Sequence, residues 1–160
     1  MKNELEKSNQ AAVQRLERIS HGTHLLHRAL DELWEELPDP LDKRMVVVRG
    51  FSNVVRQHAT AQWLLIQNEL DVSAMALVRP TYETTLRAIW AFRGAEDAWI
   101  EEFLSPVPAA LISDAETRMG PDVNTMLRVI AQHHPAFIHE PLIALKDATW
   151  RGMHSYVHGG

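Results

Sequence analysis

Apolar residues recur every seven positions through the first part of the chain, and this repeat constrains the fold more than any other feature. One set comprises Leu5, Ala12, Ile19, Leu26 and Leu33, and a second comprises Leu16, Leu30 and Leu37. A seven-residue spacing keeps apolar side chains on one narrow stripe of an α-helix, as in coiled coils. The repeat therefore predicts a long amphipathic helix over residues 3–37 that supplies the seam of a bundle or an oligomer.

Prolines and helix-capping residues delimit the next helix. The sequence Pro38-Asp39-Pro40 ends the first helix, and Asp42 has a side chain suited to cap a second one. We expect this second helix to run over residues 43–70. Its buried positions are predicted to be Val47, Phe51, Val54, Val55, Trp63 and Ile66.

A third helix is predicted to begin with a cap at Asp71 or Ser73 and to continue to about Leu104. Pro80 within it removes a backbone donor, so we expect a kink over residues 76–80, and Gly94 is a second weak point. The inner face is predicted to hold Ala74, Val78, Tyr82, Thr85, Ile89, Phe92, Ile100 and Phe103.

The remaining chain predicts shorter helices and a long final one. Residues 105–108 form a firm break, and residues 109–119 are predicted to be a short helix. Pro121 suits the first turn of a helix ending near His134, and the last helix begins at about Glu140. No segment shows the alternation typical of a strand. The sequence thus predicts an all-α single domain over residues 1–160, an up-and-down helical bundle of four long helices plus short helices.

Composition limits the classes of protein to consider. The chain has 160 residues, 46% of them hydrophobic and none of them cysteine, and a formal net charge of -5. Its first ten residues are mostly charged or polar, and its apolar runs are far shorter than a membrane span. We therefore expect a soluble, cytoplasmic protein that does not enter a membrane. The net negative charge provides no DNA-binding signal, so contact with RNA would need a local basic patch.

The final stretch carries the best candidates for chemistry. On a helix of about 100° per residue, Arg151, His154 and His158 lie within roughly 60° of one another. An arginine can hold a phosphate as its charge grows, and a histidine can accept a proton near neutral pH. We predict these three as catalytic residues, with Tyr156 supporting them.

Other histidines allow a metal site as an alternative. His154 and His158 have the spacing of two metal ligands on one helix, and His58 would complete a three-histidine site in a bundle. A triplet at His21, His24 and His27 is better interpreted as surface histidines. The pair at residues 133–134 is typical of a helix C-terminus, where positive charge is favoured.

Arg79, Glu83 and Arg87 follow one another at four-residue intervals along the third helix. They form either a solvated row of ion pairs or a supporting site in which Glu83 orients a residue of the last helix. A buried glutamate needs a partner. We therefore expect a Glu83 carboxylate oxygen within about 2.7–3.2 Å of Arg79 or of Arg151, His154 or His158.

The spacing of Arg151 and His158 resembles the R-x4-6-H motif of the HEPN superfamily, whose ribonucleases carry it on a late helix. Six residues separate the two positions here. This resemblance implies RNA cleavage without a metal. The polar residue that usually follows the arginine in active HEPN enzymes is Gly152 in this chain.

A longer resemblance covers roughly half of the chain. The stretches AMALVRPTYETTLRAIWAFRGAEDAWIEEFLSP and KDATWRGMHSYVHGG are similar to an uncharacterised bacterial family of helical cytoplasmic proteins. The family shows R-P-x-x-E on a central helix and then W-x5-Y-V-H-x-G, here Arg79, Glu83, Trp150, Tyr156, His158 and Gly160. Family members continue into another helical segment, which leaves open that a further C-terminal segment is missing here.

Together these observations predict a HEPN-like, metal-independent RNA-cleaving or RNA-binding protein without a cofactor, acting as a homodimer in a toxin or defence system. Two alternatives stay open. The chain would be a non-catalytic helical protein-interaction module if Arg79, Glu83 and His158 only lock helix packing. It would be a three-histidine bundle metalloenzyme if His58, His154 and His158 converge.

Overall fold

The computed structural model describes the backbone of residues 2–106 and 119–158, and the side chains of residues 6–7, 9–106 and 119–150. These residues form α-helices joined by turns, and no strand occurs among them, which confirms the all-α prediction. The chain divides into two compact units, Met1–Asp39 and Pro40–Gly160. No helix in the described part of the chain combines the length and apolar character that a bilayer span requires.

The first unit contains one described helix. Helix α1 (Lys2–Glu36) is 35 residues long, as its seven-residue repeat predicts. Beyond it, the backbone N–H of Leu37 donates to the carbonyl of Trp34 at 3.3 Å. The chain then reaches Pro38, whose missing N–H prevents the helix from continuing.

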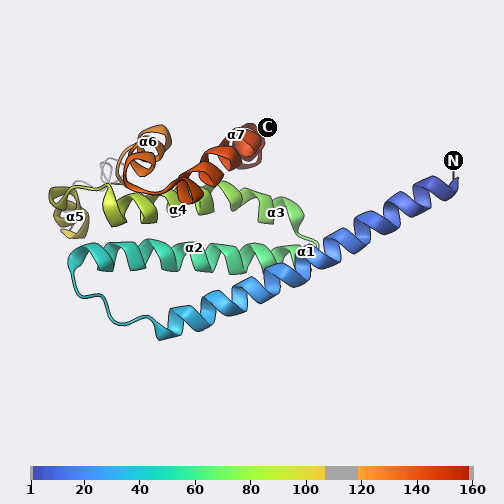
Figure 1. The fold of residues 1–160 in the computed structure, drawn as a ribbon, viewed down its shortest axis with the longest axis horizontal. Coiled ribbons are helices and arrows are strands. Elements are labelled where there is room, and N and C mark those ends of the chain that lie inside the picture. Colours follow the sequence, from blue (N-terminus) through green and yellow to red (C-terminus); the bar gives the residue numbers. More distant parts are fainter. Residues whose placement is uncertain (1, 107–118, 159–160) are drawn as a thin grey trace. The chain divides into compact units, whose positions relative to one another are not determined.

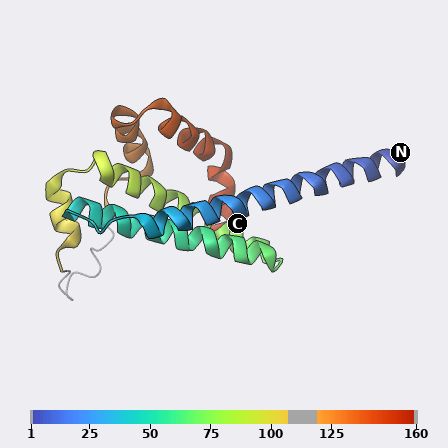
Figure 2. The ribbon, with the colours of Figure 1, turned by 60° about the horizontal axis from the view of Figure 1, so that its bottom comes forward.

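In the second unit, helix α4 lies between α2 on one side and α6 with α7 on the other (Figures 1 and 2). Helix α2 packs along α4 and also contacts α3 and α5. The helices of this unit are α2 (Lys43–Gln67), α3 (Asp71–Ala76), α4 (Val78–Arg93), α5 (Asp97–Leu104), α6 (Val123–His133) and α7 (Ala136–His158).

Helix capping at two N-termini follows from the sequence. The Asp42 carboxylate accepts the backbone N–H of Met45 at 2.8 Å, which confirms the predicted start of α2. Helix α6 begins after Asp122, whose carboxylate accepts the backbone N–H groups of Asn124 and Thr125. Hydrogen bonds from Thr125 above all lower the pKa of Asp122. An acceptor at this position satisfies N–H groups that lack partners within the helix.

The predicted third helix is not continuous, because the structure divides that segment into α3, α4 and α5. The breaks fall at Leu77, within the predicted kink over residues 76–80, and at Gly94, the predicted second weak point. Leu77 separates α3 from α4, and Pro80 therefore lies in the first turn of a new helix, where its missing N–H costs little. The predicted cap is also wrong. Leu70 is the N-cap of α3 and makes no side-chain cap, whereas Asp71 lies inside the first turn.

Other helix boundaries differ by a few residues. Helix α2 ends at Gln67 rather than near residue 70, α6 begins at Val123 rather than Pro121, and α7 begins at Ala136 rather than Glu140. Pro141 lies inside α7. The short helix predicted over residues 109–119 falls almost wholly outside the described residues.

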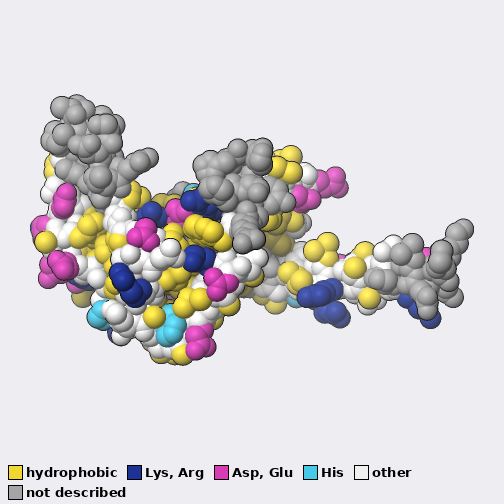
Figure 3. All heavy atoms as spheres, turned by 90° about the horizontal axis from the view of Figure 1, so that it is seen from above, with side chains coloured by type: hydrophobic (Ala, Val, Ile, Leu, Met, Phe, Trp, Pro, Cys, Tyr) yellow, Lys and Arg dark blue, Asp and Glu magenta, His cyan; other side chains and the backbone are white. Residues whose placement is uncertain are grey.

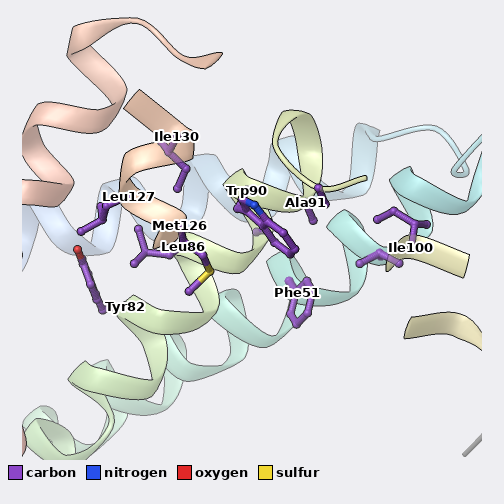
Figure 4. Close-up of a cluster of buried hydrophobic side chains, with 12 residues drawn as sticks. Phe51, Tyr82, Leu86, Trp90, Ala91, Ile100, Met126, Leu127 and Ile130 are labelled. Atoms are coloured by element: carbon purple, nitrogen blue, oxygen red, sulfur yellow. The ribbon is translucent and has the colours of Figure 1, made fainter. Parts of the chain in front are cut away.

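The core lies on both sides of α4. Leu86 of α4 and Met126 and Ile130 of α6 are fully buried, and their side chains point toward one another (Figure 4). Phe92, predicted to face inward, is 41% exposed, while Leu86 and Ala91 have no exposed surface. Because α4 is covered on two sides, its buried surface is wider than the single stripe that the prediction assumed.

The predicted inner face of α2 is also partly wrong. Val47 and Phe51 are buried, whereas Val54 is 38% and Ile66 is 49% exposed. Since exposed apolar side chains are common in folded proteins, periodicity alone does not distinguish these positions.

Aromatic packing around Trp90 closes the end of α4. Its ring lies 4.6 Å from that of Trp99 in an edge-to-face arrangement, and Trp99 stacks on Phe103 at 5.0 Å. Two glycines make room for Trp90. A Cβ on Gly94 would lie 2.8 Å from the Trp90 ring, and one on Gly120, where φ is +88°, would lie 2.9 Å from it.

Arg44 joins the beginning of α2 to the end of α4. Its guanidinium donates to the carbonyl of Ala91 at 2.5 Å and of Ala95 at 2.8 Å. It also donates to Asp97 at 2.6 Å. Carbonyl groups at a helix C-terminus lack partners within the helix, so this cation stabilises the turn between α4 and α5.

We predict opposite effects of alanine at two glycines. Gly50 lies exposed in α2 with no atom within 4 Å of an added Cβ, so Gly50→Ala should raise the free energy of unfolding by about 1 kcal/mol. In Gly94→Ala the new Cβ would lie 2.6 Å from Val129 and 3.2 Å from the Trp90 carbonyl, and overpacking of this kind costs about 1–3 kcal/mol. Urea denaturation followed by circular dichroism measures both. If Gly50→Ala and Gly94→Ala changed the free energy of unfolding equally, this result would contradict the packing around Trp90.

Candidate functional site

The described part of the candidate site is a row of charges along α4. The Nε of Arg79 donates to Glu83 Oε1 at 2.8 Å, and Arg87 Nη1 lies 3.6 Å from Glu83 Oε2. The side chains are only 17–25% exposed. Arg87 also donates through Nε to the carbonyl of Met119 at 3.0 Å. The expected contact between Glu83 and Arg79 is therefore confirmed, and the row is half-buried rather than fully solvated.

Trp150 of α7 covers one end of this row. The guanidinium carbon of Arg79 lies 5.0 Å from the centre of the Trp150 ring, which is a cation–π distance. The same ring meets Tyr82 edge to face, with centroids 6.1 Å apart. Trp150 thus links the charged row on α4 to the C-terminal half of α7.

Tyr82 provides a second link between the two helices. It is 4% exposed, and its hydroxyl donates to the carbonyl of Leu142 at 2.9 Å. Burial above all, together with the negative charge of Asp147, raises the pKa of Tyr82 to about 12. The phenol therefore stays neutral and keeps its donor at physiological pH.

Helix α6 holds the middle of α7. The Lys146 ammonium donates to the side-chain oxygen of Asn124 at 2.7 Å, and α6 packs against α7. Contacts to α4 and α6 therefore position α7 up to Trp150. The next residue in the chain is Arg151.

The predicted catalytic residues Arg151, His154 and His158, and the supporting residue Tyr156, belong to α7. The backbone of this stretch is helical, and its side chains lie outside the described residues. Their roles therefore stay predictions. Within the described side chains, Glu83 is paired with Arg79 and Arg87 of its own helix.

The other predicted histidine sites are described in part. The side chains of His21 and His24 are exposed and that of His27 is half-buried. His58 is half-buried, with a buried Nδ1 that has no hydrogen-bond partner among the described residues. No group of three possible metal ligands occurs among the described residues, but the proposed partners of His58 lie outside them.

The residues 133–134 mark a helix end as predicted, since α6 ends at His133 and His134 is its C-cap. The two differ in their surroundings. His133 is exposed, whereas burial above all lowers the pKa of His134. His134 therefore favours the neutral form, and His133 is the basic residue in the last turn of α6.

Sequence reasoning missed three contacts of this site: Tyr82 to Leu142, Trp150 over Arg79, and Arg87 to Met119. Each joins residues far apart in the chain. Tyr82 was expected to face inward, but no local signal identifies the carbonyl that its hydroxyl reaches.

The fold and site define an all-helical protein whose central helix carries a half-buried Arg–Glu–Arg row covered by a tryptophan. Residues 52–160 match the model of a family of unknown function (DUF6988), and the chain belongs to that family. This confirms the expected resemblance to a helical family of unknown function. No curated protein matches the chain. No solved structure matches it either.

We predict that Tyr82 ionises at unusually high pH. Since its pKa in the fold is above the ordinary value of 10.0, the neutral form stabilises the fold fully below pH 10, and this stability is lost as pH rises toward 12. The chain has 2 tyrosines, so Tyr156→Phe leaves Tyr82 alone to be followed by tyrosinate absorbance. We expect a midpoint well above 10 in buffer and about 10 in denaturant. Equal titration midpoints in buffer and in denaturant would contradict the burial of the Tyr82 hydroxyl.

Proposed function

We propose that this protein binds and cleaves single-stranded RNA without a metal, in the manner of HEPN ribonucleases, in the cytoplasm. Arg151, His154 and His158 carry the reaction. The observation that supports this is the contact of Trp150 with Tyr82 and Arg79, because it anchors α7 immediately before Arg151. His154 and His158 follow one turn and two turns beyond Trp150 along a helix that continues to His158.

In the proposed reaction, His158 accepts the proton of a 2′-hydroxyl group. The 2′-oxygen attacks the adjacent phosphorus while Arg151 stabilises the growing negative charge on the phosphate. The bond from phosphorus to the 5′-oxygen breaks, and His154 donates a proton to that leaving oxygen. The products are a 2′,3′-cyclic phosphate and a 5′-hydroxyl end, so the balance requires no metal and no cofactor.

Purified protein should cleave a fluorescent single-stranded RNA in EDTA and leave DNA of the same sequence intact, because DNA lacks the attacking hydroxyl. His158→Ala and Arg151→Ala should each lower the rate by about a hundredfold or more. His133→Ala is the matched control, since His133 is an exposed histidine outside the proposed site. We expect it to retain full activity.

Three results would change the assignment. Cleavage that persists in His158→Ala, purified in parallel, would remove the nuclease proposal. Cleavage that disappears in EDTA would favour the three-histidine site with His58. RNA binding without cleavage would retain the binding function alone.

A non-catalytic interaction module is the second candidate, and one observation favours it. Glu83 pairs with Arg79 and Arg87 of its own helix, and Arg79 also lies against Trp150, so the row of charges helps to hold Trp150 against α4. Figure 3 shows basic, acidic and hydrophobic side chains interspersed on the described part of one face of the molecule.

A double-mutant cycle separates the two functions. Glu83→Gln should lower the free energy of unfolding, and combination with His158→Ala should show a coupling of about 0.5 kcal/mol or more if the row supports the reacting histidine. The matched cycle pairs Glu83→Gln with His133→Ala, for which we expect additivity. Additive effects in both cycles, with RNA cleavage unaffected by Glu83→Gln, would support the interaction module.

A further inference from the structure

The apolar stripe of α1 has no partner within its own unit. That unit, Met1–Asp39, holds α1 and no other described helix. The large apolar side chains of the seam are accordingly exposed, by 48–65%. They are those of Leu16, Ile19, Leu26, Leu30, Leu33 and Leu37. An apolar stripe of this kind along one helix marks an interaction surface.

The spacing of the stripe specifies the kind of surface that covers it. Leu16, Leu30 and Leu37 occupy the a positions of a heptad repeat, and Ile19, Leu26 and Leu33 occupy the d positions. A strict repeat of seven keeps the seam facing a parallel or antiparallel helix over many turns, because both helices wind around each other. A helix that packs on a broad globular surface does not need so strict a seven-residue repeat.

The length of α1 points to a second copy of the same helix. Helix α1 has 35 residues, or about 52 Å at 1.5 Å per residue. The longest helix in the described part of the other unit, α2, has 25 residues, or about 38 Å. A second α1 has the same length and therefore covers the seam from end to end.

Polar positions within the seam favour a parallel arrangement in register. Asn9 and Thr23 also occupy a positions, and in a parallel pair each lies opposite its own counterpart. An asparagine at such a position fixes register because each amide can pair with the other. The flanking positions from 15 to 34 add no repulsion, since Arg15 would lie opposite Ser20, Gly22 opposite His27 and Ala29 opposite Trp34 of the second copy.

We propose that α1 forms a parallel, in-register coiled coil with α1 of a second copy of this chain. A strip about 50 Å long and about 10 Å wide has a footprint on the order of 500 Å² per copy, so two copies together reach the roughly 1,000 Å² expected of a biological interface. The family match begins at residue 52, so this dimerisation helix lies outside the matched region. The proposal does not depend on RNA cleavage.

Sedimentation of the full chain tests the seam with a matched pair of variants. Leu26 lies in the seam and Leu25 beside it, and both are exposed by similar fractions, 58% and 50%. Leu26→Asp should weaken dimerisation by about a hundredfold or more, because it places an unpaired charge in the seam. Leu25→Asp should leave the dimer intact. Circular dichroism of each variant checks that helix content is retained.

Cysteine cross-linking tests the orientation, and the chain contains no cysteine that would interfere. A single Leu33→Cys near one end of α1 should form a disulfide-linked dimer on mild oxidation, because only a parallel pair brings position 33 of both copies together. Leu25→Cys should cross-link far less. A monomeric wild-type chain, a dimer unaffected by Leu26→Asp, or equal cross-linking by the two cysteine variants would overturn the proposal.

Discussion

The burial of α4 on two opposite sides is the constraint on which the rest of the second unit depends. Helix α2 covers one side, and α6 with α7 covers the other. Leu86 and Ala91 consequently have no exposed surface, and Trp90 fills space that Gly94 and Gly120 leave open. Because interiors are packed as densely as crystals, these small and large residues must fit one another. Arg44 then stabilises the carbonyl end of the same helix.

A central helix with charged residues beside its core needs partners for them. Glu83 lies between two arginines, so the negative charge of this half-buried carboxylate is compensated, while Arg87 also donates to the carbonyl of Met119 and Arg79 lies against Trp150. Tyr82 meets the same demand differently, since its buried hydroxyl donates to Leu142. The Tyr82 hydrogen bond and the contact of Arg79 with Trp150 also join α4 to α7, together with the apolar packing of Leu142 and Trp150 on the core.

The two units of the chain relate differently to its family. The family of unknown function covers residues 52–160, which include α4, α7 and the contact between Arg79 and Trp150. Helix α1 lies outside that match and carries a surface with a different chemistry, an apolar seam without charges on its a and d positions from 12 to 33. The proposed dimer seam on α1 and the proposed site on α7 therefore lie in different units, and each can be tested by its own variants.

Local sequence signals determined the helical class, the extent of α1 and the start of α2, because periodicity, prolines and the Asp42 cap act within a few residues. The contact of Arg79 with Glu83 was predictable for the same reason, since they are one helical turn apart. Only the tertiary structure decided that Phe92 is exposed and that Trp150 covers Arg79. Those outcomes depend on which helices dock against α4, and docking is decided by shape and burial between residues distant in the chain.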